Sequence, residues 1–164
     1  MTSEIRRNIW SRFCKKFSTS NMYRPAKLHM GEESQDKTGS TQDFPFLGMT
    51  MEKKGRLIDG FNFFAGCGDT ESIAQPITSI KQPAKVVLEK DESGNDTRLT
   101  INSKDGTETT IELYGEKDPN QYRDLVGRVA YSLYEKRNYS HGNDRDDWLE
   151  AERKIRNAQM IITQ

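Results

Sequence analysis

The stretch "TRLTINSKDGTETTIEL", residues 97–113, decides the fold. Apolar and polar side chains alternate along it on both sides of a central Asp105-Gly106 pair. The alternating apolar residues are Leu99, Ile101, Ile111 and Leu113. Alternation predicts a strand with one buried face, and an Asp-Gly pair between two such runs favours a tight hairpin turn. The stretch therefore predicts a β-hairpin, and with it an antiparallel sheet.

Further strand patterns precede this hairpin, and no helical pattern interrupts them. They are "PAKLHM" (25–30), "FPFLGMTMEK" (44–53), "LIDGFNFFA" (57–65), "QPITSI" (75–80) and "AKVVLEK" (84–90). The segment "GEESQDKTGSTQD" (31–43) is expected to be a polar, mobile loop, and "ESGND" (92–96) a turn. Short strands at this spacing predict a small antiparallel sheet or an SH3-like barrel.

An amphipathic helix is predicted before the strands, from Ser3 to about Ser18. Its apolar residues recur at three- and four-residue spacing, and they are Ile5, Ile9, Trp10, Phe13 and Phe17. Ser3 is the expected N-cap, and Glu4 in the first turn suits the helix dipole.

A helical hairpin is predicted after the strands. Asp118, Pro119 and Gln121 have the spacing of a capping box that starts the first helix. Its apolar stripe comprises Tyr122, Leu125, Val126, Val129, Leu133 and Tyr134. The second helix carries Trp148, Ala151, Glu152, Ile155, Ala158, Gln159 and Ile162 along one side. The fold class is thus α+β, with a helix-plus-sheet domain at 1–115, a helical hairpin at 116–164 and a boundary near Gly115 to Asp118.

Composition excludes several classes of protein. The chain is 33% hydrophobic and 30% charged, with zero formal net charge, so bulk charge favours neither nucleic acid nor membrane as partner. Cys14 and Cys67 form no CxxC pair, which argues against a zinc site and suits a reducing cytoplasm. No segment approaches the ~20 apolar residues of a membrane span. We predict a cytoplasmic protein without a cofactor.

The stretch "HGNDRDDWLEAE", residues 141–152, is the strongest candidate for a functional site. Asp144 stands at the expected N-cap of the second helix, and Asp146 and Asp147 stand in its first turn, so capping explains all three. A binding surface made of His141, Asp144, Asp147 and Trp148 is the functional alternative. A metal-dependent or acid–base enzyme is a further one, although a divalent metal needs more ligands than this loop offers and His29 is distant in sequence.

Two other segments invite a functional interpretation. The first 30 residues carry a strong basic excess, and a basic helix could bind nucleic acid through Arg6, Arg7, Arg12, Lys15 and Lys16. The simpler interpretation is a solvated helix face. In "AGCGD" (65–69) a lone GxG is followed by no helix pattern, so we expect a tight turn around Cys67 rather than a phosphate loop or a catalytic thiol.

Residues 129–155 contain the pattern H-G-x-D-x-x-D-W-L-x-A-E after a helix that ends in aromatic and charged residues. The matching positions are His141, Gly142, Asp144, Asp147, Trp148, Leu149, Ala151 and Glu152. This segment resembles a bacterial family, domain of unknown function twenty-nine thirty-four. The resemblance implies a helical hairpin and brings no activity with it.

A second resemblance covers residues 4–113. It rests on "W..F...FS" at Trp10 to Ser18, on "PFLGM", on "QPAKVVL" and on "LTINSKDGTET". These motifs are similar to those of another bacterial family, domain of unknown function fifty-three thirty-five. The chain departs from that family at "NMYRPAKL", where relatives carry a Gly-Trp strand. No activity is implied here either.

These observations favour a non-enzymatic binding or protein-interaction module. We expect no catalytic residues and no bound metal. An unidentified protein is the expected partner, nucleic acid is the alternative partner, and a membrane is not expected.

Overall fold

The computed structural model describes residues 1–30, 44–66, 76–115 and 119–163. The helical elements are η1 (Arg7–Ile9), α1 (Trp10–Asn21), α2 (Pro119–Lys136) and α3 (Asp144–Thr163). The strands are β1 (Thr2–Glu4), β2 (Pro25–Met30), β3 (Phe44–Lys54), β4 (Leu57–Ala65), β5 (Thr78–Lys81), β6 (Pro83–Lys90), β7 (Asp96–Ser103) and β8 (Glu108–Leu113). The predicted cap at Asp118, the predicted loop at 31–43 and Cys67 lie outside the described residues, as does the side chain of Gln121.

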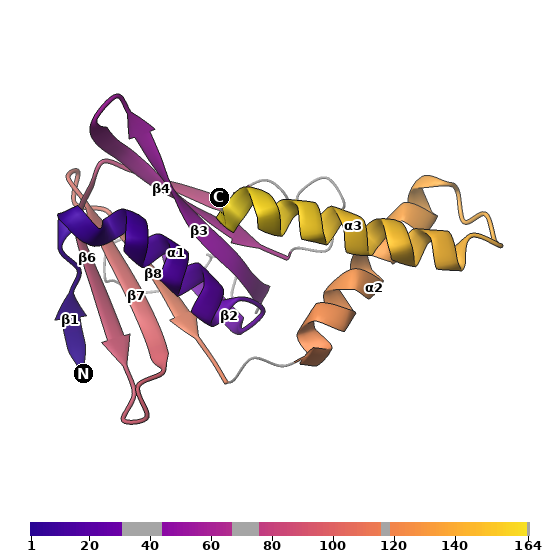
Figure 1. Ribbon diagram of the computed structural model, residues 1–164, viewed down its shortest axis with the longest axis horizontal. Helices are drawn as coiled ribbons and strands as arrows, with labels where there is room; N and C mark the ends of the chain where they lie inside the picture. The colour runs from indigo at the N-terminus through magenta and orange to yellow at the C-terminus, as the bar shows by residue number, and fades with distance from the viewer. Residues whose placement is uncertain (31–43, 67–75, 116–118, 164) are drawn as a thin grey trace.

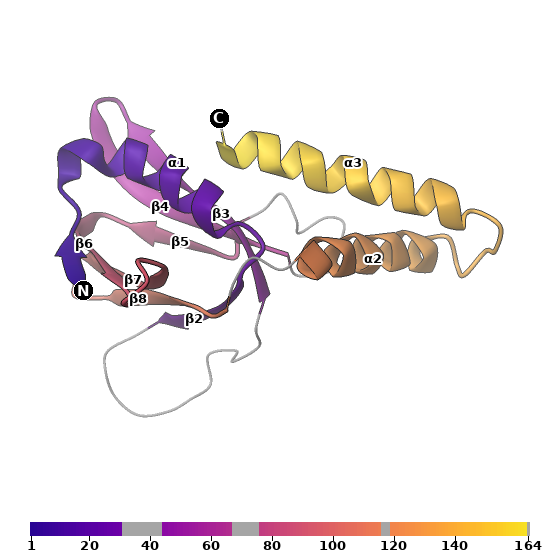
Figure 2. The same ribbon diagram turned by 60° about the horizontal axis from the view of Figure 1, so that its bottom comes forward.

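Within the described residues the strands form one antiparallel sheet in the order β1-β6-β7-β8-β2-β3-β4-β5. The sheet bends over itself without closing into a barrel, and α1 lies across its concave side (Figures 1 and 2). The α2–α3 pair extends away from the sheet at one end (Figure 2). The predicted α+β class is confirmed, in its open-sheet rather than its barrel form.

The hairpin predicted from residues 97–113 is present as β7 and β8. Its register pairs Leu99 with Ile111, and both are fully buried. In the turn, Asp105 Oδ1 accepts a hydrogen bond of 2.9 Å from the Thr107 backbone N–H. Gly106 has φ +91°, a value that glycine adopts without steric cost. Alternation and turn chemistry thus correctly predicted the hairpin, and its register brings the apolar residues of both strands to the buried face.

The predicted helix start at Ser3 is wrong. Thr2–Glu4 instead forms β1, which pairs antiparallel with β6 and places Ser3 opposite Leu88. The Ile5 backbone N–H continues this pairing by donating to Val86 O at 2.8 Å. The α-helix begins only at Trp10, because the backbone before it is occupied by sheet hydrogen bonds and a 3-10 turn.

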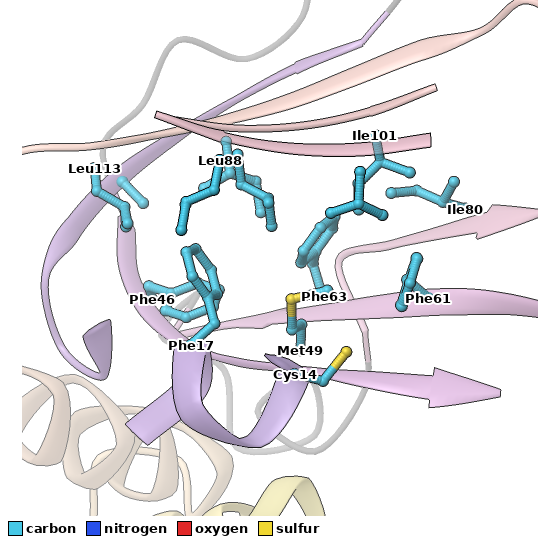
Figure 3. Close-up of a cluster of buried hydrophobic side chains, with 14 of the residues drawn as sticks. Cys14, Phe17, Phe46, Met49, Phe61, Phe63, Ile80, Leu88, Ile101 and Leu113 are labelled. Atoms are coloured by element: carbon cyan, nitrogen blue, oxygen red, sulfur yellow. The ribbon is translucent and has the colours of Figure 1, made fainter. Parts of the chain in front are cut away.

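The main hydrophobic cluster lies between α1 and the bent sheet (Figure 3). Trp10, Cys14 and Phe17 of α1 face strands β3 and β4. The Ser18 hydroxyl fixes the helix to β3, since it accepts from Met49 N at 2.9 Å and donates to Met49 O at 3.1 Å. This cluster is the core that the alternating strand residues were predicted to form.

A second cluster joins the helical hairpin to the outer side of β3 and β4. The sheet contributes Leu47 and Phe64. The helices contribute Leu125, Val126, Val129, Ala151, Ile155, Ala158 and Ile162. Most of the predicted helical stripes are therefore buried, and the hairpin packs directly on the sheet.

Candidate functional site

His141 lies exposed in the loop between α2 and α3, against the ring of Tyr134. The ring centroids are 5.6 Å apart, and Tyr134 Oη is 3.4 Å from His141 Nε2. Tyr134 also packs edge-on against Tyr139 at 5.3 Å. The histidine thus belongs to a small aromatic group at the tip of the hairpin.

The predicted capping pattern is displaced by one residue. The backbone N–H of Asp147 donates to Asn143 O at 2.9 Å, so Asn143 rather than Asp144 occupies the N-cap position. Asp144 and Asp146 remain in the first turn of α3, exposed, where their charges suit the helix dipole. The charge–dipole part of the interpretation therefore fits Asp144 and Asp146, whereas the predicted N-cap at Asp144 is wrong.

Asp147 differs from the exposed Asp144 and Asp146, because its side chain is buried, with only 3% of the residue exposed. Its carboxylate forms an ion pair with Arg137 at the end of α2. This pair joins α3 to the start of the loop that follows α2. Nothing in the 141–152 pattern signals this, because the partner lies outside that pattern, just after α2.

His141, Asp147 and Trp148 each make contacts within the hairpin. Trp148 is half-buried against the second cluster, and its Nε1 donates to Glu152 Oε1 at 3.2 Å. Across the described ranges, no group of three or more histidine, cysteine, aspartate or glutamate side chains is placed to hold a metal ion. Of the predicted surface, His141 and Asp144 face solvent, whereas Asp147 is buried.

A cavity that sequence reasoning missed lies beside α1, with a volume of about 780 Å³. It is bordered by α1, by β6 and by the turn that connects β6 to β7. Its apolar wall consists of Ile5, Ile9, Phe13, Phe17 and Leu88. Its charged and amide groups belong to Arg12, Lys16, Asn21, Arg24, Lys90, Asn95 and Asp96. The volume is within the range typical of small-molecule sites.

Arg24 anchors one end of this cavity although only 7% of it is exposed. Its Nε donates to Gly115 O at 2.8 Å, and its Nη1 donates to Asn21 Oδ1 at 2.8 Å and to Asp96 O at 2.7 Å. Burial lowers the pKa of the guanidinium, while the nearby Asp96 and Asp91 act in the opposite direction. The guanidinium is thus held rigidly by two backbone carbonyls and an amide.

The second terminal nitrogen of Arg24, Nη2, has no hydrogen-bond partner among the described residues. Arg24 is among the residues that line the cavity. A buried arginine held in place beside the cavity is the most specific polar feature of its described lining.

The basic residues predicted to bind nucleic acid are divided by the fold. Arg12 and Lys16 lie one helical turn apart and line the cavity, while Arg6 and Lys15 are exposed elsewhere. Arg7 stacks over the ring of Trp10 at 5.0 Å. The sequence did carry a signal for this part of the lining. Ile9, Arg12, Phe13 and Lys16 recur at three- and four-residue spacing, which places basic and apolar side chains on one face of the helix.

A charged network covers part of the outer face of the sheet. Glu112 on β8 accepts from Tyr114 Oη at 2.5 Å and from Arg98 Nη2 at 2.8 Å, and His29 Nε2 lies 3.4 Å from it. The hydrogen bond from Tyr114 is the largest cause that lowers the pKa of the Glu112 carboxyl. Arg98 and His29 are on the strands next to β8, and Tyr114 directly follows β8, so ordinary stabilisation of a solvated sheet face explains these contacts.

The comparisons with known proteins address the hairpin alone. Residues 124–157 match the family described as "Protein of unknown function (DUF2934)". No curated protein and no solved structure matches the chain. Among the described helices none is long and apolar enough to cross a membrane. The resemblance predicted for the C-terminal hairpin is therefore confirmed, whereas the one predicted for residues 4–113 stays a prediction.

Proposed function

We propose that this protein is a non-enzymatic binding module whose ligand lies in the cavity between α1 and β6. The observation that carries the proposal is the composition of that cavity. It combines an apolar wall, made in part by Phe13 and Leu88, with positive groups such as Arg24. A mixed lining of this kind suits a small organic ligand, because the wall supplies affinity and a few polar groups fix orientation.

The chemistry of the lining supports binding rather than catalysis. Neither histidine nor cysteine is among the described residues that line the cavity. Its one described carboxylate, Asp96, is engaged by Asn21 Nδ2 at 2.8 Å and lies 3.6 Å from Lys90 Nζ. Cys14 faces the main cluster, where burial raises its pKa to about 12. The described lining therefore contains no nucleophile with an adjacent base.

Native mass spectrometry of the gently purified protein tests the proposal. A variant that fills the cavity, Ser20→Trp, should lose any small-molecule mass excess that the unmodified protein carries, because Ser20 lines the cavity. Ser11→Trp is the matched control, since Ser11 is an exposed serine of the same helix outside the lining. Equal retention of the excess by Ser20→Trp and Ser11→Trp would contradict the proposal.

Nucleic-acid binding is the second candidate, supported by the exposure of Arg6, Arg7, Arg12, Lys15 and Lys16. It predicts affinity that falls steeply with salt, because each neutralised phosphate releases counterions. Fluorescence anisotropy with a labelled oligonucleotide, measured over a series of salt concentrations, checks this. An affinity that does not change with salt would remove this candidate.

Three finer predictions accompany the proposal. The first is a cytoplasmic location, supported by the free thiol of Cys14. The second is a protein partner at the hairpin tip, supported by the exposure of His141 and Asp144. The third is a bacterial origin, suggested by the two family resemblances.

A further inference from the structure

The cavity has more positive than negative groups on its described lining. Arg12, Lys16, Arg24 and Lys90 contribute the positive charges, and Asp96 is the described acid. Asp96 is already engaged by Lys90 and by the Asn21 amide. The remaining positive charge has no acidic partner in the described lining, so it favours an anionic ligand.

The buried Arg24 guanidinium gives this positive charge a fixed position. The three hydrogen bonds of Nε and Nη1 hold the guanidinium plane in place, and Nη2 makes no hydrogen bond to another described residue. Because the group is already positioned, binding of an acid group to it would cost little arginine side-chain entropy. A hydrogen bond between two charged groups is also stronger than a neutral one.

Another part of the lining is apolar. Ile5, Ile9 and Phe13 of the N-terminal segment contribute to it, together with Leu88 of β6. Ile9 is 40% exposed, so this surface is open to solvent in the unliganded protein. A hydrocarbon chain that covered it would remove apolar surface from water.

We propose that the ligand is a single-tailed amphipathic anion, with its acid group at the guanidinium of Arg24 and its hydrocarbon against Phe13 and Leu88. This inference rests on the proposed function and specifies its ligand class. Arg12 and Lys16 are exposed residues of the lining, and their positive charges attract the acid group. Carboxylate and phosphate heads share this chemistry.

Calorimetric titration with four ten-carbon probes tests the inference. The probes are decanoate, decyl phosphate, 1-decanol and decyltrimethylammonium, each used below its micelle concentration. At least one anionic probe should bind ten or more times as tightly as the alcohol, and the cationic probe should bind most weakly. Comparison of the two anions then distinguishes a fatty-acid source from a phosphorylated one. Equal binding of the alcohol and both anions would overturn the inference.

Variants on α1 locate the acid group without disturbing the buried network. The pair Arg12→Gln/Lys16→Gln should weaken the anionic probes by about fivefold to tenfold and leave the alcohol unchanged. The matched control, Arg6→Gln/Lys15→Gln, removes the same charge from exposed positions outside the lining and should change affinity by less than about twofold. Equal losses in both variants would overturn the inference, because only bulk charge would then matter.

Arg24→Lys provides the direct test of the fixed point. It keeps the charge but cannot reproduce the guanidinium fork, so the anions should lose affinity relative to the alcohol while a circular dichroism spectrum confirms folding. The two proposals fail separately. Binding of every probe with equal affinity, blocked by Ser20→Trp, would leave the binding module standing. Absence of all binding, together with no bound mass, would remove both proposals.

Discussion

The main hydrophobic cluster and the hairpin cluster share strands β3 and β4 but are built from different kinds of contact. The main cluster draws buried residues from α1 and from strands β2 to β8, which span most of the chain. The hairpin cluster draws on α2 and α3, and in the described residues it takes only Leu47 and Phe64 from the sheet as fully buried members. Loss of a contact in the first should therefore affect the whole sheet, whereas the second can loosen locally.

The largest expected effect is in the main cluster, at Phe46. Its side chain is fully buried, and its ring meets that of Phe17 edge-on at 5.4 Å. Phe46→Ala should lower the free energy of unfolding by about 3–5 kcal/mol, because it leaves a cavity as well as losing buried area. Urea titration followed by circular dichroism measures this. A loss below about 1 kcal/mol would mean that the cluster collapses around the gap.

Ile155→Ala makes the corresponding change in the hairpin cluster, where Ile155 is fully buried. We expect a cost of about 2–5 kcal/mol for the docked hairpin, with the sheet kept intact. The two tryptophans report the parts separately, since Trp10 belongs to the main cluster and Trp148 packs on the hairpin cluster. In NMR spectra of Ile155→Ala, the indole N–H signal of Trp148 should leave its native position at a lower urea concentration than that of Trp10.

Leu149→Ala is the control for this variant, because Leu149 lies on the same helix and is 52% exposed. It should change stability by no more than about 0.5 kcal/mol. Simultaneous loss of both indole signals in Ile155→Ala would contradict the separation of the two clusters and would describe a single cooperative unit.

Gly48→Ala tests the contact between the hairpin and β3 from the strand side. Gly48 has φ +147°, and a Cβ there would come within 2.4 Å of Ile162 Cγ2 of α3. We expect a loss of about 1–3 kcal/mol, from overpacking and backbone strain, concentrated on hairpin docking. Hydrogen exchange should increase in α3 more than in β7. Faster exchange spread evenly over both would show that β3 itself is distorted.

The smallest perturbation is chemical labelling of Cys14, which needs no change in the core. Burial raises its pKa to about 12, so near neutral pH the reactive thiolate forms only when the main cluster opens. In a Cys67→Ser background, labelling by iodoacetamide should be slow in the unaltered core and faster in Phe46→Ala. It should remain slow in Ile155→Ala. Rapid labelling in Ile155→Ala would show that the two clusters open together.

The strands were the most predictable part of the fold, because their signals are local. The patterns at 25–30 and 57–65 coincide with β2 and β4. The strand β1 was missed because its three residues are all exposed and show no apolar alternation. Ile5 and Ile9 have helical spacing, so the predicted helix was extended into residues 2–5. In the structure these residues pair with β6.

The candidate site was less predictable, because its contacts join residues from separate segments of the chain. The aspartates of the 141–152 segment were interpreted within one helix, yet Asp147 pairs with Arg137, which directly follows the helix before it. The cavity was missed because its walls come from separate segments. Arg24 carried no signal of its own in the sequence.

The sequence by itself determined the alternating strands, the Asp105-Gly106 turn and the two helices of the hairpin. These follow from side-chain periodicity and turn chemistry, which act between residues a few positions apart. Only the tertiary structure decided the β1–β6 pairing, the docking of the hairpin on β3 and the setting of Arg24. Asn21 is near Arg24 in sequence, but Asp96 and Gly115 reach it only once the sheet has bent. Arginine is usually a surface residue, and burial among these distant partners fixes Arg24 in place beside the cavity.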